Sequence, residues 1–356
     1  MNIMKILLLP VALLYGIVVA CRNWLYDAGI LPSAEFNTSI IVIGNLSVGG
    51  TGKSPMTEYL VRLLKDNFPV ATLSRGYKRH TTGFFIADKD SNSHQIGDEP
   101  LQFKKKFPEI IVSVDENRKQ GIEKLLAQFP ELKVILLDDA FQHRRVKPGL
   151  SILLTDYGQL FYDDFLLPAG TLREWRAGKK RADIIIATKC PDHLTPVEKR
   201  IIHKKIAPEA HQQVLFSHIK YSKPVALFPH TKELEGKPDV VLITGVSKPL
   251  PLEDHLQKKA NTIIPLRYPD HHEYTLVEAT QLVETFHKIS SSNKVIITTE
   301  KDAMRLDKPG LVEVLHKLPM YYIPIETTFD EKEKAEFNQL IIDYVTRTNQ
   351  KYSGAY

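Results

Sequence analysis

The feature that most constrains the fold is a glycine-rich segment at residues 47–54, which reads Ser-Val-Gly-Gly-Thr-Gly-Lys-Ser. It follows an apolar, β-branched run at 40–43 and precedes a stretch at 54–65 with the composition of a helix. Glycines let backbone N–H groups turn toward an anion without obstruction by a Cβ atom, and a helix N-terminus attracts negative charge. This order of strand, turn and helix predicts a phosphate-binding loop (P-loop).

The end of this loop indicates nucleotide chemistry. We predict that Lys53 reaches the β- and γ-phosphates of ATP and that the Ser54 hydroxyl binds Mg²⁺. Ser47 departs from the strict pattern, which has glycine there, so a glycine-rich turn followed by an ordinary lysine is the alternative; the context between strand and helix disfavours it. The residues predicted to bind the cofactor are Ser47, Val48, Gly49, Gly50, Thr51, Gly52, Lys53 and Ser54.

The rest of the chain predicts an α/β protein with a mostly parallel sheet. Short β-branched runs alternate with helix-like stretches at 39–43, 70–73, 110–114, 134–137, 151–155 and 183–188. Runs this apolar are typical of parallel strands covered on both faces. We therefore expect a P-loop kinase core at 31–215, a linker with hairpin-like strands at 216–235, and a smaller C-terminal α/β domain at 236–356.

The N-terminal segment, residues 1–30, is predicted to be a membrane-associated helix, and it contains an uncharged run at 6–20. As a helix this run would measure roughly 22 Å, short of the roughly 30 Å hydrocarbon core of a bilayer. We favour a shallow or partial membrane anchor. A cleaved export signal, suggested by the sequence Val-Val-Ala-Cys at 18–21, and a buried core helix are the alternatives.

Charge and cysteine content exclude some classes of protein. The 47 basic and 42 acidic residues give a formal charge of only +5, too small and dispersed for nucleic-acid binding. Cys21 and Cys190 are the two cysteines. They lie far apart in the sequence, which argues against a disulfide framework and a cysteine-based metal cluster.

Two pairs of carboxylates are candidates for metal binding and catalysis. Asp138 and Asp139 end the apolar run at 134–137, where a second strand could hold Mg²⁺ beside the phosphate loop, and Asp138 is the better candidate. Asp98 and Glu99 begin a predicted helix. Without other information, the simpler interpretation of Asp98 is that it caps the helix. The alternative is a catalytic role, in which Asp98 accepts a proton from an attacking hydroxyl and Glu99 lies near the metal.

Histidines and arginines could complete such a site. Asp270-His271-His272 could supply a partner that orients a base, although a histidine pair in a loop is commonly a surface feature. Arg75 and Arg173 lie in turns after strand or loop signals, where α/β sites form, and Arg118 is a further candidate for phosphate binding. Each arginine alone could equally be a solvated surface charge.

Taken together, these motifs resemble the tetraacyldisaccharide 4'-kinase (lipid A 4'-kinase) family. The resemblance covers roughly residues 9 to 306. It consists of the apolar N-terminal segment followed, in order, by the sequences GNLSVGGTGKSP, LSRGYKR, GDEP, LLDDAFQHRR, LPAGTLREW, YPDHHEY and TTEKDAMRL. The loops of that family commonly have serine or threonine at the place of Ser47. The family also shares the Glu300-Lys301-Asp302 signature, for which the sequence gives no firm role.

The resemblance implies ATP-dependent phosphorylation of the 4'-hydroxyl of an acylated glucosamine disaccharide 1-phosphate, at the cytoplasmic face of the bacterial inner membrane. By similarity, Lys53 and Ser54 bind ATP and Mg²⁺, Asp98 is the general base and Glu99 and Asp138 face the metal. His271, rather than His272, is expected to pair with Asp98. Arg118 and Arg173 match arginines near phosphate groups. We expect a monomer.

Two other classes of protein compete with this reading. A P-loop GTPase or ATPase acting as a conformational switch or maturation factor would need base recognition. Residues 188–192, Thr-Lys-Cys-Pro-Asp, nearly match the guanine-binding sequence Asn-Lys-x-Asp, but the first residue differs and the carboxylate is one place too far. A membrane-anchored binding module with a decayed site is disfavoured because Lys53, Ser54, Asp98 and Asp138 are all present.

Overall fold

A computed structural model describes residues 3–229, 231, 234 and 236–353. The chain folds into two compact units. Unit 1 contains Met1–Ile96, Phe103–Lys220 and Glu326–Tyr356; unit 2 contains Gly97–Gln102 and Tyr221–Ile325. Of the predicted linker at 216–235, residues 230, 232, 233 and 235 lie outside the described residues.

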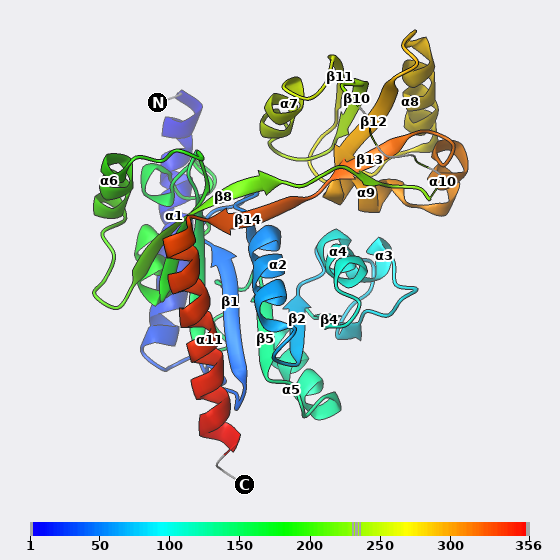
Figure 1. Ribbon diagram of the computed structural model, residues 1–356. Coiled ribbons are helices and arrows are strands. Elements are labelled where there is room, and N and C mark those ends of the chain that lie inside the picture. The colour runs from blue at the N-terminus through cyan, green and yellow to red at the C-terminus, as the bar shows by residue number, and fades with distance from the viewer. Residues whose placement is uncertain (1–2, 230, 232–233, 235, 354–356) are drawn as a thin grey trace. The chain divides into compact units, whose positions relative to one another are not determined.

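Unit 1 is built on a nine-stranded sheet with the order β14-β8-β7-β6-β1-β5-β2-β4-β3 (Figure 1). The strands are β1 (Ser39–Asn45), β2 (Val70–Ser74), β3 (Phe85–Ile86), β4 (Ile111–Val114), β5 (Val134–Asp138), β6 (Leu150–Asp156), β7 (Ile184–Cys190), β8 (Gln213–Tyr221) and β14 (Ile325–Phe329). The helices are α1 (Ile3–Asp27), α2 (Lys53–Leu64), α3 (Ser93–Ile96), α4 (Asp98–Lys106), α5 (Arg118–Gln128), α6 (Pro196–Ile206) and α11 (Glu331–Ser353). The first residues of α4, Asp98 to Gln102, belong to unit 2.

The pairing in this sheet explains where a site can form. β1 lies between β5 and β6 and is parallel to both, and β2 is parallel to β4 and β5. Every residue of β1, β2, β5 and β6 is buried, which is the pattern of strands covered on both faces. Parallel strands end at the same edge of the sheet, so the loops that follow β1, β2 and β5 come together there.

Unit 2 has a five-stranded sheet of order β11-β10-β12-β13-β9. Its elements are β9 (Val225–Ala226), β10 (Asp239–Thr244), α7 (Leu250–Gln257), β11 (Thr262–Arg267), α8 (Leu276–Lys288), β12 (Lys294–Thr299), α9 (Glu300–Leu306), α10 (Pro309–Leu315) and β13 (Met320–Ile323). The four longer strands are parallel and β9 is antiparallel to β13. The fold is therefore the mixed α/β architecture with mostly parallel sheets that the sequence predicted.

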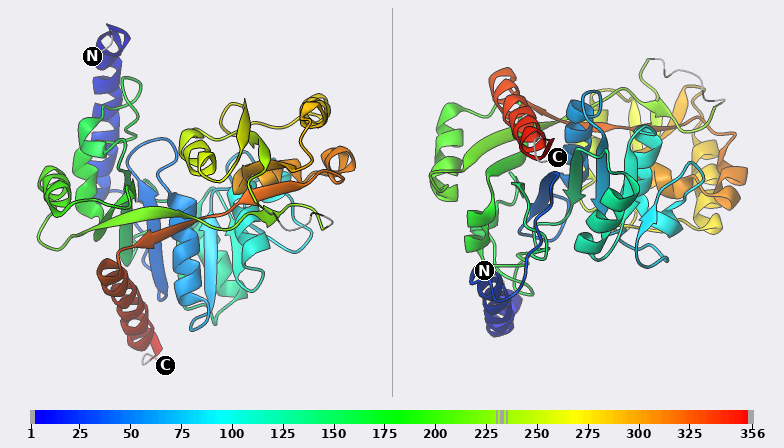
Figure 2. Two further views of the ribbon diagram at one scale, coloured as in Figure 1. Left: turned by 45° about the horizontal axis from the view of Figure 1, so that its top comes forward. Right: turned by 90° about the horizontal axis from the view of Figure 1, so that it is seen from below.

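The end of the chain differs from the predicted domain boundaries. The sequence placed all of 236–356 in the second domain, whereas Glu326–Tyr356 belong to unit 1. Helix α11 explains the difference: Phe337, Ile341 and Val345 are fully buried on one face, and the Tyr344 hydroxyl donates to the Ile40 carbonyl oxygen of β1 at 3.2 Å. In both views of Figure 2, α1 and α11 lie well apart on unit 1.

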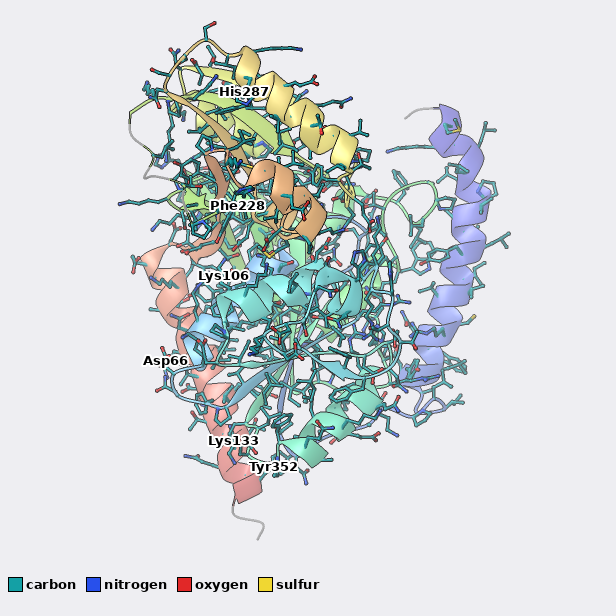
Figure 3. The ribbon with its side chains drawn as sticks, turned by 90° about the vertical axis from the view of Figure 1, so that its right-hand side faces the viewer. Asp66, Lys106, Lys133, Phe228, His287 and Tyr352 are labelled. Carbon is teal, nitrogen blue, oxygen red and sulfur yellow. The ribbon has the colours of Figure 1, made fainter. Side chains whose placement is uncertain are left out.

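Helix α1 spans 25 residues of the segment at 1–30 that was predicted to be helical, extends beyond the uncharged run at 6–20 and continues through Pro10. Residues 4–27 are long and apolar enough to cross a membrane by length and composition. One face packs on unit 1: an added Cβ atom at Gly16 would lie 2.5 Å from Leu166 and 2.7 Å from Trp175. The opposite face, whose side chains project outward in Figure 3, exposes Leu7, Leu14 and Val18 among other large apolar residues.

Candidate active site

The phosphate loop connects β1 to α2 in unit 1. Gly49 and Gly52 have φ angles of 105° and 87°, in the left-handed region that favours glycine, and α2 begins at Lys53. Two side chains from β7 hold carbonyl groups of the loop. The Thr188 hydroxyl donates to the Thr51 oxygen at 2.8 Å, and the Lys189 ammonium donates to the Gly50 oxygen. These contacts orient the loop backbone at the edge of the sheet.

Two cations meet at Asp139, the residue after β5. Lys53 Nζ lies 3.6 Å from Asp139 Oδ1, and Arg173 Nη1 lies 3.1 Å from the same oxygen. Asp139 has a φ of 48°, an unusual angle for a residue with a side chain. The backbone N–H of Arg173 donates to the Leu46 oxygen at 2.7 Å, which ties the 164–175 segment to the start of the phosphate loop.

Asp138 ends β5 and is 1% exposed. Its Oδ1 accepts a hydrogen bond of 3.2 Å from Thr57 of α2, and Ser54, also in α2, is buried. A carboxylate and a hydroxyl on neighbouring elements are the oxygen ligands that Mg²⁺ prefers, so these residues fit the predicted metal role in chemical type.

Arg118 begins α5 and is one of the largest fully buried side chains. It donates to the Asp115 carbonyl oxygen at 2.7 Å and to the Asp138 carbonyl oxygen at 3.4 Å. Burial lowers the pKa of its guanidinium to about 10 despite nearby Asp138, so it stays charged at neutral pH. Arg75, exposed, follows β2 at the same edge of the sheet.

Sequence reasoning did not single out His143, which lies in the turn after β5. Burial, together with the charges of Arg118 and Arg75, lowers its pKa to about 4. His143 is therefore neutral at physiological pH, in a region rich in positive charge. The only signal for it in the sequence is its place inside LLDDAFQHRR.

Several buried polar atoms at this edge of the sheet have no hydrogen-bond partner among the described residues. They are the Asn45 amide oxygen and nitrogen, the Thr51 and Ser74 hydroxyls and the Arg118 Nε. Asn45 ends β1 and Ser74 ends β2, so the atoms belong to adjacent loops and strand ends. Buried polar groups are costly without partners, and the donors of this set are of the type that binds an oxygen-rich anion.

A second cluster of predicted residues lies within unit 2. Asp98, the first residue of α4, accepts a hydrogen bond of 2.7 Å from Arg305 Nε to its Oδ2. His271 Nδ1 lies 3.7 Å from the same oxygen. Burial would raise the pKa of Asp98, but the contact with His271 and the charge of Arg305 outweigh it, and the net pKa is lowered. Asp98 is thus a carboxylate at neutral pH.

The signature that the sequence left without a role contacts this cluster. Lys301 Nζ forms an ion pair with Glu99 Oε1, and Asp302 accepts from Arg305 Nη1 at 2.9 Å. Sequence reasoning missed Arg305, although it lies inside TTEKDAMRL. By contrast, His272 turns to another partner: its Nε2 lies 2.9 Å from Glu278 Oε1 and its ring stacks on Tyr268.

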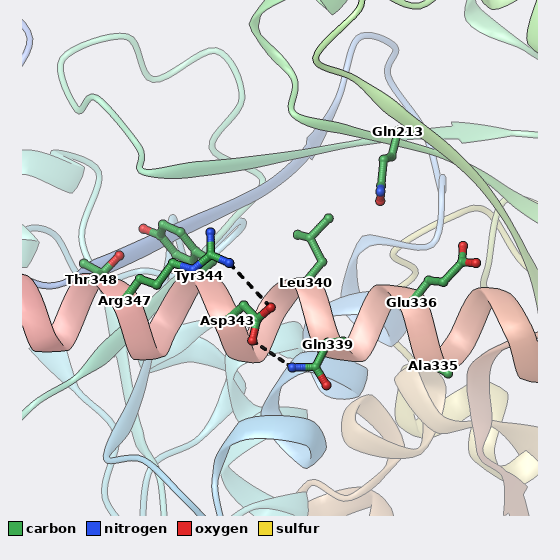
Figure 4. Close-up of a pocket in the computed structure, with 9 residues that line it drawn as sticks. All are labelled: Gln213, Ala335, Glu336, Gln339, Leu340, Asp343, Tyr344, Arg347 and Thr348. Atoms are coloured by element: carbon green, nitrogen blue, oxygen red, sulfur yellow. Dashed lines mark hydrogen bonds and ion pairs between the residues drawn. The ribbon is translucent and has the colours of Figure 1, made fainter.

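A separate pocket on unit 1 contains none of these residues (Figure 4). It is lined by one residue of β8 and by the outer residues of α11: Gln213, Ala335, Glu336, Gln339, Leu340, Asp343, Tyr344, Arg347 and Thr348. No described contact joins the residues that line this pocket to the phosphate loop, and they are distant from the loop in sequence. We therefore assign the pocket no part in catalysis.

In unit 1, a central strand of a parallel sheet leads through a glycine-rich loop into a helix. A lysine begins this helix, and an aspartate ends the adjacent strand. These features define a P-loop nucleotide-binding protein. Comparison with known proteins gives the particular family. A sequence profile described as LpxK, tetraacyldisaccharide-1-P 4'-kinase, matches residues 4–345. The chain belongs to this family.

Individual relatives agree with the profile. The chain is 46% identical to tetraacyldisaccharide 4'-kinase of Bacteroides thetaiotaomicron, over 97% of this chain and 94% of the relative. It is 43% identical to the enzyme of the same name from Flavobacterium johnsoniae, over 97% and 98%. The crystal structure of an "apo" form LpxK from Aquifex aeolicus in complex with ATP superposes with a TM-score of 0.74 at 26% identity, covering 96% of this chain and all of that chain.

Proposed function

We propose that this chain transfers the γ-phosphate of ATP to the 4'-hydroxyl of a tetraacylated glucosamine disaccharide 1-phosphate, a lipid A precursor. One observation supports ATP as the phosphate donor. Lys53, the first residue of the helix after the phosphate loop, and Arg173 both contact Asp139. The acceptor comes from the names of the relatives.

The proposed roles of the residues follow their chemistry. Lys53 and Arg173, assisted by Arg118 and Arg75, bind the transferred phosphate and the charge that develops on it. Asp98 accepts the proton of the sugar hydroxyl as the phosphate is transferred, and His271 lies beside it. The lowered pKa keeps Asp98 deprotonated at neutral pH, as a proton acceptor must be, and also makes the carboxylate a weaker base.

We assign Mg²⁺ to Ser54 and Asp138, with Asp139 and Glu99 as the further carboxylates predicted to face it. The oxygen donors and the burial of Ser54 and Asp138 support this assignment. When bound, Mg²⁺ neutralises negative charge on the β- and γ-phosphate oxygens. The Thr57 hydroxyl orients the Asp138 carboxylate by a hydrogen bond of 3.2 Å.

We further propose that α1 associates with the cytoplasmic face of the inner membrane and that the enzyme is a monomer. One face of α1 is fixed to unit 1: Trp175 Nε1 donates to the Gly16 oxygen at 2.8 Å, and Asn23 donates to Glu174 at 2.9 Å. The opposite, apolar face is exposed. A helix held by protein on one side and apolar on the other suits an interfacial position better than an isolated span.

The test is transfer of labelled phosphate from ATP to a tetraacyldisaccharide 1-phosphate by the purified full chain in detergent. We expect a labelled lipid with ATP and Mg²⁺, none with Lys53→Ala, and normal labelling with Lys147→Ala, a surface lysine 66% exposed in its ion pair with Glu35. GTP hydrolysis without any labelled lipid would instead indicate a conformational switch.

A further inference from the structure

Arg305 is the most extensively bonded charged side chain near Asp98. Its guanidinium makes four described contacts: Nε to Asp98 Oδ2 at 2.7 Å, Nη1 to Asp302 Oδ1 at 2.9 Å and to the Gly245 oxygen at 3.0 Å, and Nη2 to His271 Nδ1 at 3.1 Å. Its side chain is only 3% exposed. An arginine at this depth with satisfied donors is fixed in position.

The groups that receive these bonds are themselves fixed. Asp302 is fully buried, and its Oδ2 accepts from the Gly245 N–H at 2.9 Å and from the Thr299 hydroxyl at 2.7 Å. Gly245 directly follows β10, and its oxygen also accepts from the His271 N–H at 3.1 Å. An added Cβ atom at Gly245 would lie 2.9 Å from Asp302 Oδ1, so the backbone must approach closely here.

The contact between Arg305 and His271 determines the protonation of the imidazole. A guanidinium can only donate hydrogen bonds, so Nδ1 of His271, facing Nη2 at 3.1 Å, must accept. The ring proton of neutral His271 then lies on Nε2. The same Nδ1 atom lies 3.7 Å from Asp98 Oδ2, so the guanidinium contacts both members of the His271–Asp98 pair.

We propose that Arg305 is a positioning residue for phosphate transfer: it orients the Asp98 carboxylate and fixes the Nε2–H tautomer of His271, while Asp302 and Gly245 hold the guanidinium. This inference rests on the proposed function, in which Asp98 receives the proton of the sugar hydroxyl. It also gives the Glu300-Lys301-Asp302 signature a purpose, because Asp302 supports Arg305 and Lys301 pairs with Glu99.

The kinetic test uses Arg305→Ala and Arg305→Lys. Lysine keeps the charge but has one nitrogen, which cannot reach all four partners. We expect both variants to lower kcat by about 10- to 100-fold, the scale of a misplaced catalytic group, with the KM for ATP unchanged. Added guanidinium ion should restore part of the kcat of Arg305→Ala. Arg267→Ala, which breaks a two-bond pair with Glu253 elsewhere in unit 2, should keep wild-type kcat.

A double-mutant cycle separates positioning from a purely structural role. If Arg305 acts through Asp98, adding Arg305→Ala to Asp98→Asn should lower the residual rate by less than about threefold, because the group it orients is already lost. A full, independent loss in that background, or wild-type kcat in both single variants, would overturn the proposal.

A measurement on the unmodified residue covers the case in which the Arg305 variants do not fold. In ¹⁵N-histidine-labelled protein, with the His271 signals assigned by their absence in His271→Gln, we expect the proton on Nε2 at neutral pH. A proton on Nδ1 would overturn the proposal. If the wild-type chain phosphorylates no lipid, the proposed function fails, whereas the tautomer still reports on the Arg305 contact.

Discussion

Asp139 and Lys189 in unit 1 and His271 in unit 2 adopt left-handed backbone conformations, with φ angles of 48°, 57° and 57°. Such angles cost on the order of 1 kcal/mol or more each and persist where surrounding contacts fix them. Asp139 is held by Lys53 and Arg173, and the Lys189 ammonium lies 3.0 Å from Asp156. These contacts fix Asp139 and Lys189 in conformations that residues with side chains rarely adopt.

At Asp98, we predict that replacement by asparagine lowers kcat by about 10²- to 10⁴-fold, because asparagine keeps the shape but cannot accept the proton. ATP binding should not change, since the phosphate loop residues are intact. Rate measurements and nucleotide titration of the same preparation check both parts. Unchanged turnover would remove Asp98 from the mechanism.

At His143, the lowered pKa of about 4 predicts acid sensitivity of the fold. Between pH 6.5 and 4 the unfolded chain binds a proton at this histidine and the folded chain does not, so stability falls as pH falls through that range. The loss is at most about 3 kcal/mol. Melting temperatures of His143→Gln should decline less steeply than those of wild type from pH 7 to pH 5; parallel curves would contradict the assignment.

At the scale of elements, α1 is connected to the phosphate loop through residues 164–175. The Tyr15 hydroxyl donates to the Arg173 oxygen at 2.6 Å, and the Arg173 N–H donates to the Leu46 oxygen. The side chain of Arg173 then contacts Asp139. The helix therefore supports the position of Arg173, the proposed phosphate-binding arginine, in addition to its proposed association with a membrane.

This connection predicts the effect of Gly16→Val. Since a Cβ atom at Gly16 would already lie 2.5 Å from Leu166, valine must displace α1 from unit 1. We expect a loss of about 1–3 kcal/mol in stability and lower kinase activity even in detergent, where no bilayer is needed. Val18→Leu, on the exposed face, serves as the control. Full activity of Gly16→Val would show that the helix only anchors the protein.

The apolar face of α1 gives a separate prediction. Replacing exposed Leu7, Leu14 and Val18 by serine should lower binding to phospholipid vesicles by about tenfold or more, because each side chain contributes on the order of 1 kcal/mol when buried. The matched control replaces Leu276 and Val277, which are similarly exposed on α8 of unit 2. Equal vesicle sedimentation of both variants would contradict a membrane role for α1.

Elements with strong local signals were predictable from the sequence. The phosphate loop and the buried parallel strands follow from glycine spacing and from apolar runs, and α2 begins at Lys53, one residue before the predicted start. The packing of α11 on unit 1 was not predictable, because it depends on contacts between residues that are distant in sequence. Arg305 was missed for the same reason: 207 positions separate it from Asp98.

At the scale of the whole molecule, the two units carry different halves of the predicted chemistry. Unit 1 holds the phosphate loop, Asp138, Asp139 and the arginines, whereas unit 2 holds Asp98, His271 and Arg305. Both sets belong to one chain that matches the family profile from residue 4 to residue 345. We therefore expect kinase activity to need both sets, with nucleotide binding depending on the residues of unit 1.

The position of the new phosphate tests this account most directly. The purified chain is incubated with ATP, Mg²⁺ and a tetraacylated glucosamine disaccharide 1-phosphate, and the product is analysed by mass spectrometry and ³¹P NMR. The account predicts one added phosphate, on the 4'-hydroxyl, and its loss in Lys53→Ala and Asp98→Asn. ATP hydrolysis with an unchanged lipid, or phosphate on another hydroxyl, would contradict it.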